Sequence, residues 1–247
     1  MLKMVLVVDI GNTRIKCAVY ELDTLKAVFV FTEKEAENNF KNILFSYPNV
    51  TDLIVSSVAK TLTFDLQTIS NDLNIHFVSN LDSFPFENKY ATPKTLGVDR
   101  MILAAGATLL YPKQNRLIID AGTCVTYDFV DENDNYWGGA ISPGFRLRYE
   151  SLHQFTAKLP LLTLEEPEGL VGSSTNQSIH SGVVNGLICE MDGFIERYKQ
   201  QNENFTIILT GGDAVFLAKR LKNTIFANSN FLLESLNQFF QYKIKND

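Results

Sequence analysis

Short hydrophobic runs alternate with polar turns and with stretches of helical spacing along the whole chain. In the first half, hydrophobic runs bounded by turn-forming residues predict strands over residues 4–9, 15–22, 53–58 and 75–78. Helical spacing predicts helices over residues 33–45, 62–73 and about 99–110. In the first of these helices, one face carries Ala36, Phe40, Ile43 and Leu44.

A polar break at Pro112–Asn115 is the predicted boundary between two domains, residues 1–115 and 116–247. A chain of 247 residues is long for one domain and suits two. After the break the same alternation starts again. It predicts strands over residues 117–120, 125–130, 136–141 and 205–209, and helices over about 145–156, 177–199, 214–221 and 231–242.

The two halves open with the same short pattern, which indicates an internal duplication. Val7-Val8-Asp9-Ile10-Gly11 aligns with Ile118-Ile119-Asp120-Ala121-Gly122, and a small polar turn and a further strand follow in both. Each half then continues with alternating strands and helices, so the fold class is predicted to be α/β. Two such domains related by duplication would form a cleft between them.

Composition narrows the class of protein. Hydrophobic residues make up 45% of the chain and charged residues 20%, which are values for globular proteins. The net charge is -6 and Lys and Arg form no block, so no nucleic-acid partner is expected. Cys17, Cys124 and Cys189 are far apart, which favours reduced thiols over disulfides or a zinc site. No signal peptide or membrane span is expected, and a cytoplasmic location is predicted.

The two Asp-x-Gly turns are candidates for binding phosphate. Glycine allows positive φ and a close approach of the backbone, and the N–H groups of such a turn can bind an anion. Thr13 and Thr123 would add hydroxyl donors, while Asp9 and Asp120 could hold a cation that neutralises the phosphates. One such turn alone would be interpreted as an ordinary hairpin turn. Two copies on matching strands favour phosphate binding.

A third glycine turn, Leu209-Thr210-Gly211-Gly212-Asp213, is predicted to end a strand and begin a helix. Its paired glycines would let a flat adenine or a ribose lie against the backbone, although alone it would be interpreted as an ordinary strand-to-helix turn. The sequence contains no GxxxxGK[ST], GxGxxG or HExxH motif. This argues against P-loop kinases, Rossmann dehydrogenases and zincins.

Together, the three turns resemble the phosphate and adenosine motifs of the actin-like ATPase and sugar kinase superfamily. The resemblance is closer to type III pantothenate kinases, and these motifs follow the family order over nearly the whole chain. Asp9–Lys16 resembles D-x-G-N-T-x-x-K, Gly97–Arg100 resembles G-x-D-R, Asp120–Asp128 resembles D-x-G-T-x-x-T-x-D, Gly138–Gly144 resembles G-G-x-I-x-P-G, and Gly172–Thr175 resembles G-x-S-T. One departure is Cys124, where a small residue such as Ala is usual.

This resemblance implies two duplicated ribonuclease H-like (actin-like ATPase) domains with a nucleotide cleft between them. The implied activity is ATP-dependent phosphorylation of pantothenate to 4'-phosphopantothenate, the first step of coenzyme A biosynthesis. The implied cofactors are Mg²⁺ with ATP and a monovalent cation, K⁺ or NH₄⁺, and the implied assembly is a homodimer whose acceptor pocket lies near the subunit interface.

The resemblance also implies roles for single residues. Asp99 would be the general base, and Asp120 would hold the monovalent cation. ATP would be bound by Asp9, Ile10, Gly11, Asn12, Thr13, Arg14, Ile15, Lys16, Thr123, Gly211 and Gly212. Pantothenate would be bound by Tyr90, Gly97, Val98, Asp99, Arg100 and Thr175.

Structural explanations compete with several of these roles. Asp99 and Thr175 stand where a helix N-cap would stand. Arg100, in a first helical turn, would ordinarily be solvated, Tyr90 would cover the core, and Lys16 would face water. No ligand pattern includes any of the histidines, which are predicted to be structural: His76, His153 and His180.

Two other functions remain as alternatives. One is a related kinase that acts on another small alcohol, such as a sugar. The lack of a long substrate insertion argues against it. The other is a non-catalytic, nucleotide-binding regulator of the same fold, and the presence of Asp99 beside both phosphate turns argues against that.

Overall fold

The computed structural model describes residues 3–11, 13–57, 66–69, 73–223 and 225–246. The chain divides into two compact units. Unit 1 comprises residues 1–112 and 230–247, and unit 2 comprises residues 113–229. This division differs from the predicted halves, because residues 230–247 were expected in the second half and group with the first.

The sheet of unit 1 has the strand order β3-β2-β1-β4-β5. Antiparallel pairing joins β1 to β2 and β2 to β3, whereas β4 pairs in parallel with β1, and β5 with β4. The strands are β1 (Met4–Ile10), β2 (Ile15–Glu21), β3 (Thr24–Phe31), β4 (Val50–Ser57) and β5 (Asn74–Phe77).

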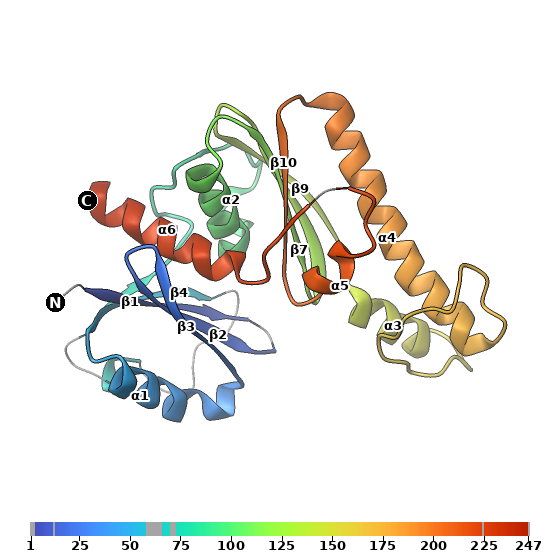
Figure 1. Cartoon of the computed structure of the whole chain (residues 1–247), viewed down its shortest axis with the longest axis horizontal. Helices are drawn as coiled ribbons and strands as arrows, with labels where there is room; N and C mark the ends of the chain where they lie inside the picture. The colour runs from blue at the N-terminus through green and yellow to red at the C-terminus, as the bar shows by residue number, and fades with distance from the viewer. Residues whose placement is uncertain (1–2, 12, 58–65, 70–72, 224, 247) are drawn as a thin grey trace. The chain divides into compact units, whose positions relative to one another are not determined.

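Helices cover both faces of this sheet. On one face, α1 (Ala36–Ser46) packs Phe40 and Ile43 against the inward side chains of the strands, among them Leu6 and Val8. On the other face, α6 (Phe231–Asn246) contacts β1, β2 and β4 and crosses α2 (Val98–Leu110), as Figure 1 shows. Shorter elements of this unit are the 3-10 turns Glu33–Glu35, Leu66–Thr68 and Pro93–Thr95 and the two-residue strand β6 (Glu87–Asn88).

Unit 2 repeats the topology of unit 1. Starting from the meander, its strand order is β9-β8-β7-β10-β11, with antiparallel pairing up to β7 and parallel pairing beyond it. These strands are β7 (Asn115–Ala121), β8 (Cys124–Val130), β9 (Asn135–Pro143), β10 (Phe205–Thr210) and β11 (Phe226–Ala227). The duplication seen in the sequence is therefore a duplication of fold.

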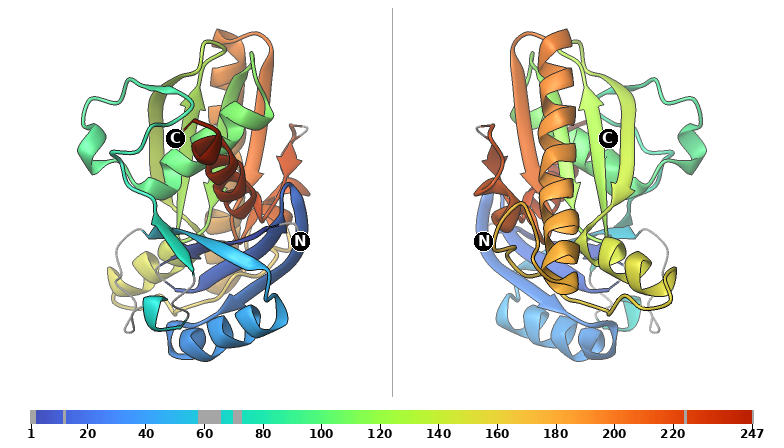
Figure 2. Two further views of the ribbon diagram at one scale, coloured as in Figure 1. Left: turned by 90° about the vertical axis from the view of Figure 1, so that its left-hand side faces the viewer. Right: turned by 90° about the vertical axis from the view of Figure 1, so that its right-hand side faces the viewer.

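The core of unit 2 lies between its sheet and the long helix α4 (Thr175–Gln201), which runs along the strands in Figure 2. Leu117 and Ile119 of β7 belong to one apolar cluster with Leu187 and Met191 of α4. Two further helices, α3 (Phe145–Gln154) and α5 (Ala214–Ala218), add buried side chains to this cluster. The long connection from residue 155 to residue 174 has no helix or strand.

Most predicted elements are present, with ends shifted by a few residues. Strand β3 was missed, because its side chains are mostly exposed and its hydrophobic residues do not form a clear buried face. The predicted helix over residues 62–73 lies largely outside the described residues, and Leu66–Thr68 forms a 3-10 turn. The predicted helix over residues 214–221 is shorter and ends at Ala218.

The crossing of α2 and α6 gives a test of how tightly unit 1 is packed. A Cβ atom on Gly106 would lie 2.0 Å from Ser235 Oγ and 2.8 Å from Ser235 Cα. Gly106→Val should therefore destabilise the protein by about 1–3 kcal/mol, the usual cost of overpacking. Gly186→Ala on α4 is the control, because a Cβ there would meet nothing within 4 Å. Chemical unfolding should show equal or higher stability for the control, and equal loss in both variants would contradict the proposed close crossing.

Candidate active site

Asp9, at the end of β1, lies in a row of polar residues across the sheet of unit 1. It pairs in register with Ser56 on β4 and with Lys16 on β2, so these three side chains lie on one face. Asp9 is 8% exposed and Ser56 is fully buried. Burial, with a further contribution from the Asp9 charge, raises the pKa of the neighbouring Cys17 thiol well above its usual value. The Asp9 carboxylate therefore acts in surroundings that screen charge poorly.

The turn after β1 closes with a hydrogen bond from Gly11 N to Arg14 O, 3.2 Å long. Thr13 and Arg14 are exposed, as a ligand-binding turn requires. Ile10 and Ile15 are buried in the core, so only their backbones could contact a ligand. Gly11 does not use the positive φ that glycine allows, since its φ lies outside the left-handed region. The predicted ATP-binding residue Asn12 lies outside the described residues.

Asp120, at the equivalent position of β7, lies in a matching row in unit 2. It pairs in register with Thr210 on β10 and with Thr126 on β8. Among the described residues, no partner is found for the buried hydroxyl of Thr126. A carboxylate and a hydroxyl oxygen on one face are ligands that a hard cation prefers. This row therefore fits a cation better than the row containing Lys16 does.

Three turns of unit 2 meet at residues 120–123. Gly144 N donates to Thr123 O at 3.1 Å, and Asp213 N donates to Ala121 O at 3.0 Å. A Cβ on Gly144 would lie 2.1 Å from Gly122 O. These contacts show why the glycine that ends the G-G-x-I-x-P-G stretch cannot carry a side chain.

In the turn between β10 and α5, Gly211 has a backbone conformation in the left-handed region, which favours glycine. Its φ is +97, and a Cβ on it would lie 2.5 Å from Asp120 Oδ1 and 2.2 Å from Ala121 O. The next residue, Gly212, is exposed, and a Cβ there would meet nothing within 4 Å. The turn therefore presents bare backbone to solvent directly beside Asp120.

Asp99 is the second residue of α2, whose N-cap is Gly97. The competing structural explanation, that Asp99 is the N-cap, does not hold: Gly97 takes that position, and the Asp99 carboxylate accepts from the N–H of the adjacent Arg100, at 2.8 Å. Burial raises the pKa of Asp99, although the hydrogen bond and charge of Arg100 act in the opposite direction. Gly97 makes room for this geometry, since a Cβ there would lie 2.4 Å from Asp99 Oδ1.

Arg100 is buried, with only 7% of it exposed, which argues against the competing explanation of a solvated side chain. Its guanidinium lies 5.8 Å from the centre of the Tyr90 ring, a cation–π distance. Tyr90 itself is half-buried, and its N–H donates to Asn88 Oδ1 at 2.9 Å. The structure thus brings Tyr90 together with the Gly97–Arg100 segment, which also contains the half-buried Val98.

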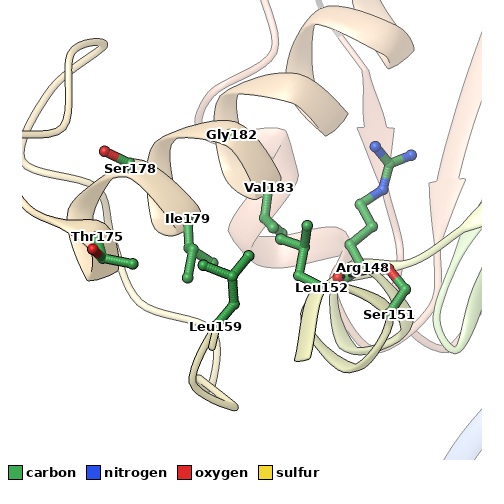
Figure 3. Close-up of a pocket in the computed structure, with 9 residues that line it drawn as sticks. All are labelled: Arg148, Ser151, Leu152, Leu159, Thr175, Ser178, Ile179, Gly182 and Val183. Carbon is green, nitrogen blue, oxygen red and sulfur yellow. Dashed lines mark hydrogen bonds between the residues drawn. The ribbon is translucent and has the colours of Figure 1, made fainter. Parts of the chain in front are cut away.

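Thr175 is the first residue of α4, and the competing explanation that it is the helix N-cap does not hold either. The N-cap is Ser174, whose side chain accepts from Gln177 N at 3.3 Å. Thr175 is exposed and lines a pocket of about 670 Å³ between α3 and α4, shown in Figure 3. Leu152, Ile179 and Val183 make the apolar part of the pocket wall, and Arg148 stands at one end.

Several residues of these sites were missed in the sequence. Ser56, Thr126 and Thr210 join their rows only through strand register, which no single-sequence pattern gives. A signal existed for Thr126, since it is the second threonine of the D-x-G-T-x-x-T-x-D stretch. Of the histidines, His180 contacts the Tyr149 hydroxyl with Nδ1 at 2.9 Å, and His76 contacts Asp52 at 3.2 Å.

Comparison with known proteins identifies the family. The family model for type III pantothenate kinase matches residues 5–197. A type III pantothenate kinase of Flavobacterium johnsoniae is 64% identical over 99% of this chain and 100% of that protein. Another, of Flavobacterium psychrophilum, is 60% identical over 97% of this chain and 100% of that protein. The chain belongs to the type III pantothenate kinase family. It is therefore a phosphotransferase that uses ATP to phosphorylate pantothenate.

Solved structures support the fold assignment alone. The structure of a glucokinase from an Antarctic psychrotroph aligns with a TM-score of 0.54 at 10% identity, covering 98% of this chain and 100% of the other. A ROK family glucokinase from Streptomyces griseus aligns with a TM-score of 0.52 at 11% identity, covering 96% and 98%. This chain thus shares the duplicated actin-like ATPase fold with sugar kinases.

Among the helices of the described chain, none has the length and hydrophobicity for a membrane crossing.

The turn after β1 yields a direct test of nucleotide binding. A Cβ on Gly11 would already lie 3.1 Å from Arg14 O, so the larger side chain of Gly11→Val must displace the turn or project towards a ligand. We expect at least about a tenfold loss of ATP affinity by calorimetry, equivalent to about 1.4 kcal/mol. Because Gly11 has no positive φ, the variant should still fold. Gly169→Val, on an open loop, is the control. Unchanged ATP affinity in folded Gly11→Val would remove this turn from the nucleotide site.

Proposed function

We propose that Asp99 is the general base of the pantothenate kinase reaction and that the two Asp-x-Gly turns bind the phosphates of ATP. The observation that carries the proposal is the burial and hydrogen bonding of the Asp99 carboxylate. The carboxylate is half-buried at the start of α2, is held by the N–H of Arg100 and does not cap the helix. Burial raises its pKa, which makes the carboxylate a stronger base than an exposed aspartate.

In the proposed reaction the primary hydroxyl of pantothenate attacks the γ-phosphorus of ATP. The new P–O bond forms as the bond to the β,γ-bridging oxygen breaks, and ADP leaves. Asp99 accepts the hydroxyl proton. Such reactions need alignment and charge neutralisation more than covalent chemistry. Arg100, held under the Tyr90 ring, supplies a fixed positive charge beside Asp99 for the acceptor carboxylate or the transferred group.

The residues present fit the proposed cations. We assign the monovalent cation, K⁺ or NH₄⁺, to Asp120, with the Thr126 hydroxyl in the same row as a further oxygen ligand. Mg²⁺ is commonly held by substrate phosphates, waters and one or two carboxylates. The described residues contain no group of three or more His, Cys, Asp or Glu side chains able to hold a metal, so Mg²⁺ would be held mainly by ATP. Bound there, it would neutralise charge on the phosphates.

The remaining assignments follow the family resemblance. Thr123, Lys16, Gly211 and Gly212 are proposed to contact ATP, and Thr175 to contact pantothenate. A homodimer and a cytoplasmic location are part of the same proposal. Exposed apolar side chains close to Thr175 in sequence, Leu170 at 79% and Val171 at 87% exposure, are consistent with a surface that a second copy covers.

The choice of acceptor is tested by measuring ATP consumption with a panel of alcohols. Pantothenate should be phosphorylated, and glucose or other sugars should give background rates. Family membership does not favour a sugar kinase or a non-catalytic regulator. Turnover of a sugar in place of pantothenate would support the first alternative, and nucleotide binding without any turnover would support the second.

Asp99→Asn separates a catalytic from a structural role. Asn keeps the size of the side chain and can still accept from Arg100 N, but it cannot take the proton. We expect kcat to fall by roughly 10²–10⁴-fold while ATP affinity is kept. The exposed Asp23→Asn is the matched control. Turnover within a few-fold of the wild type in folded Asp99→Asn would exclude the general-base assignment.

The free energy of unfolding of Asp99→Asn, measured at neutral and at acid pH, gives a second and independent test. Because the folded-state pKa of Asp99 is raised, the folded chain holds this proton more tightly than the unfolded chain does. The contribution of Asp99 to stability is thus lost as pH rises from the unfolded pKa through the folded one. Asp99→Asn should therefore be more stable than the wild type at neutral pH, with the difference shrinking in acid. Denaturant unfolding at both pH values measures this, and a loss of stability at neutral pH would contradict it.

The cation assignment predicts a response to salt identity. With Mg²⁺ and ionic strength fixed, activity should be low in Na⁺ or Tris and rise in K⁺ or NH₄⁺. Thr126→Val keeps the shape of the side chain and removes the hydroxyl, so it should weaken the apparent affinity for K⁺, as should Asp120→Asn. Thr24→Val on the exposed β3 is the control. Equal wild-type rates in all four salts would withdraw the monovalent cation from Asp120.

A further inference from the structure

The Glu190 carboxylate, in the middle of α4, accepts hydrogen bonds from three other elements of unit 2. Its Oε1 accepts from the Tyr127 hydroxyl of β8 at 2.9 Å and from the Ser142 hydroxyl of β9 at 2.5 Å. Its Oε2 accepts from the Arg148 guanidinium of α3, with which it forms an ion pair. The assignments above do not use this carboxylate, which joins α4 to both strands and to α3.

These contacts are largely withdrawn from water. Tyr127 is fully buried and its ring stacks on Phe194 of α4, with 4.4 Å between ring centres. The side chains of Glu190 and Arg148 are 24% and 20% exposed. Burial alone would raise the pKa of Glu190, but the hydrogen bonds from Ser142, Arg148 and Tyr127 lower it, so the carboxylate is ionised at neutral pH. Hydrogen bonds to an ionised group are the stronger kind and hold their partners in a defined geometry.

The peptide unit between Pro143 and Gly144 connects Arg148 to the Asp120–Thr123 turn. Its carbonyl, Pro143 O, accepts from Arg148 Nε at 2.7 Å. Its N–H, on Gly144, donates to Thr123 O at 3.1 Å. A trans peptide is planar, and its carbonyl and N–H point in opposite directions, so the two groups can only turn together. The orientation that Arg148 imposes on the carbonyl is therefore passed on to Thr123.

A second connection runs through β8. Tyr127 faces the apolar cluster that it shares with α4, and successive side chains of a strand point to opposite faces of the sheet. The preceding residue, Thr126, therefore faces the other side, where it pairs in register with Asp120. The hydrogen bond from Tyr127 to Glu190 thus holds β8 directly beside the row proposed to bind the cation.

Arg148 contributes to the wall of the pocket that contains Thr175 through its aliphatic stem. In Figure 3 its guanidinium points away from Leu152 and Leu159, which line that pocket. Two of its nitrogens donate to protein groups, Nε to Pro143 O and Nη2 to Glu190. This arrangement favours a role in holding the backbone over direct contact with a ligand in that pocket.

We propose that Glu190 is a positioning residue for the kinase reaction, which holds the Asp120–Thr123 turn in its ATP-binding geometry through Arg148 and the Pro143–Gly144 peptide. The inference rests on the proposed binding of ATP phosphates at this turn. Glu190 lies on the opposite face of the sheet from the Asp120 row, so it acts on the turn without contacting ATP or the cation.

Glu190→Gln tests this role, because Gln keeps the shape of the side chain and removes the charge that pairs with Arg148. In calorimetry at fixed Mg²⁺ and K⁺, ATP should bind about tenfold or more weakly, an effect of the size found when a group that orients a metal ligand is lost. At saturating ATP and pantothenate, kcat should stay within a few-fold of the wild type, because Asp99 is untouched. Amide hydrogen exchange at Gly144 should be faster in the ligand-free variant.

Arg148→Lys is the second variant, since lysine keeps the charge but lacks the planar fork that donates to Pro143 O and Glu190 together. It should weaken ATP binding by a similar factor. The double variant should lose no more than either single variant, because both act through the same peptide. Glu196→Gln, at an exposed position of the same helix, is the matched control and should bind ATP as the wild type does.

Unchanged exchange at Gly144 in Glu190→Gln would overturn the proposal, as would faster exchange with unchanged ATP affinity, which would leave Glu190 a purely structural role. Additive losses in the double variant would also contradict it. Thr123→Val tests the proposed phosphate contact separately, because it removes a hydroxyl of the turn itself. If Thr123→Val binds ATP normally while Glu190→Gln does not, the Thr123 contact is refuted and the role of Glu190 stands.

Discussion

The close approach of three backbone segments at residues 120–123 is the constraint on which the site in unit 2 depends. Gly144 and Gly211 both lie where a Cβ would overlap a carbonyl oxygen of this turn. The hydrogen bonds from Gly144 and Asp213 to the turn then fix the starts of α3 and α5. Because backbone contacts backbone here, the positions of Asp120, Phe145 and Asp213 are set without any flexible side chain between them.

Duplication gave the two units one topology, and their polar rows show how they diverged. In each unit an aspartate at the end of the first strand stands between a hydroxyl residue on the parallel neighbour and a polar residue on the antiparallel one. That last residue is Lys16 in unit 1 and Thr126 in unit 2. An ammonium neutralises phosphate directly, whereas a hydroxyl can only help to hold a cation that does so. The same fold thus offers two different ways of compensating negative charge.

Prediction from the sequence succeeded where a short stretch of residues by itself determines the secondary structure. Strands such as β1 and β7 are short apolar runs ended by Asp-x-Gly, and the ends of both were predicted to within two residues. It failed where the role of a residue depends on the backbone conformation or on residues that are distant in the sequence. Asp99 has the residue type of a cap, but Gly97 takes that position. Arg100 would ordinarily be in water at a helix start, and its burial beside the Tyr90 ring depends on the folded neighbours of α2. Ser56 and Thr126 lie beside the two aspartates only because of strand register, which is set when separate segments pair.

The last helix of the sequence belongs to the first unit, and this has a consequence for how the chain is made. Helix α6 covers the face of the sheet that carries Val5 and Val7 and crosses α2, whose first turn contains Asp99. All of unit 2 lies between these segments in the sequence. During synthesis, most of unit 2 is therefore made before α6, while unit 1 still exposes an apolar face. Unit 1, with the proposed base, can complete its core only once α6 has been made.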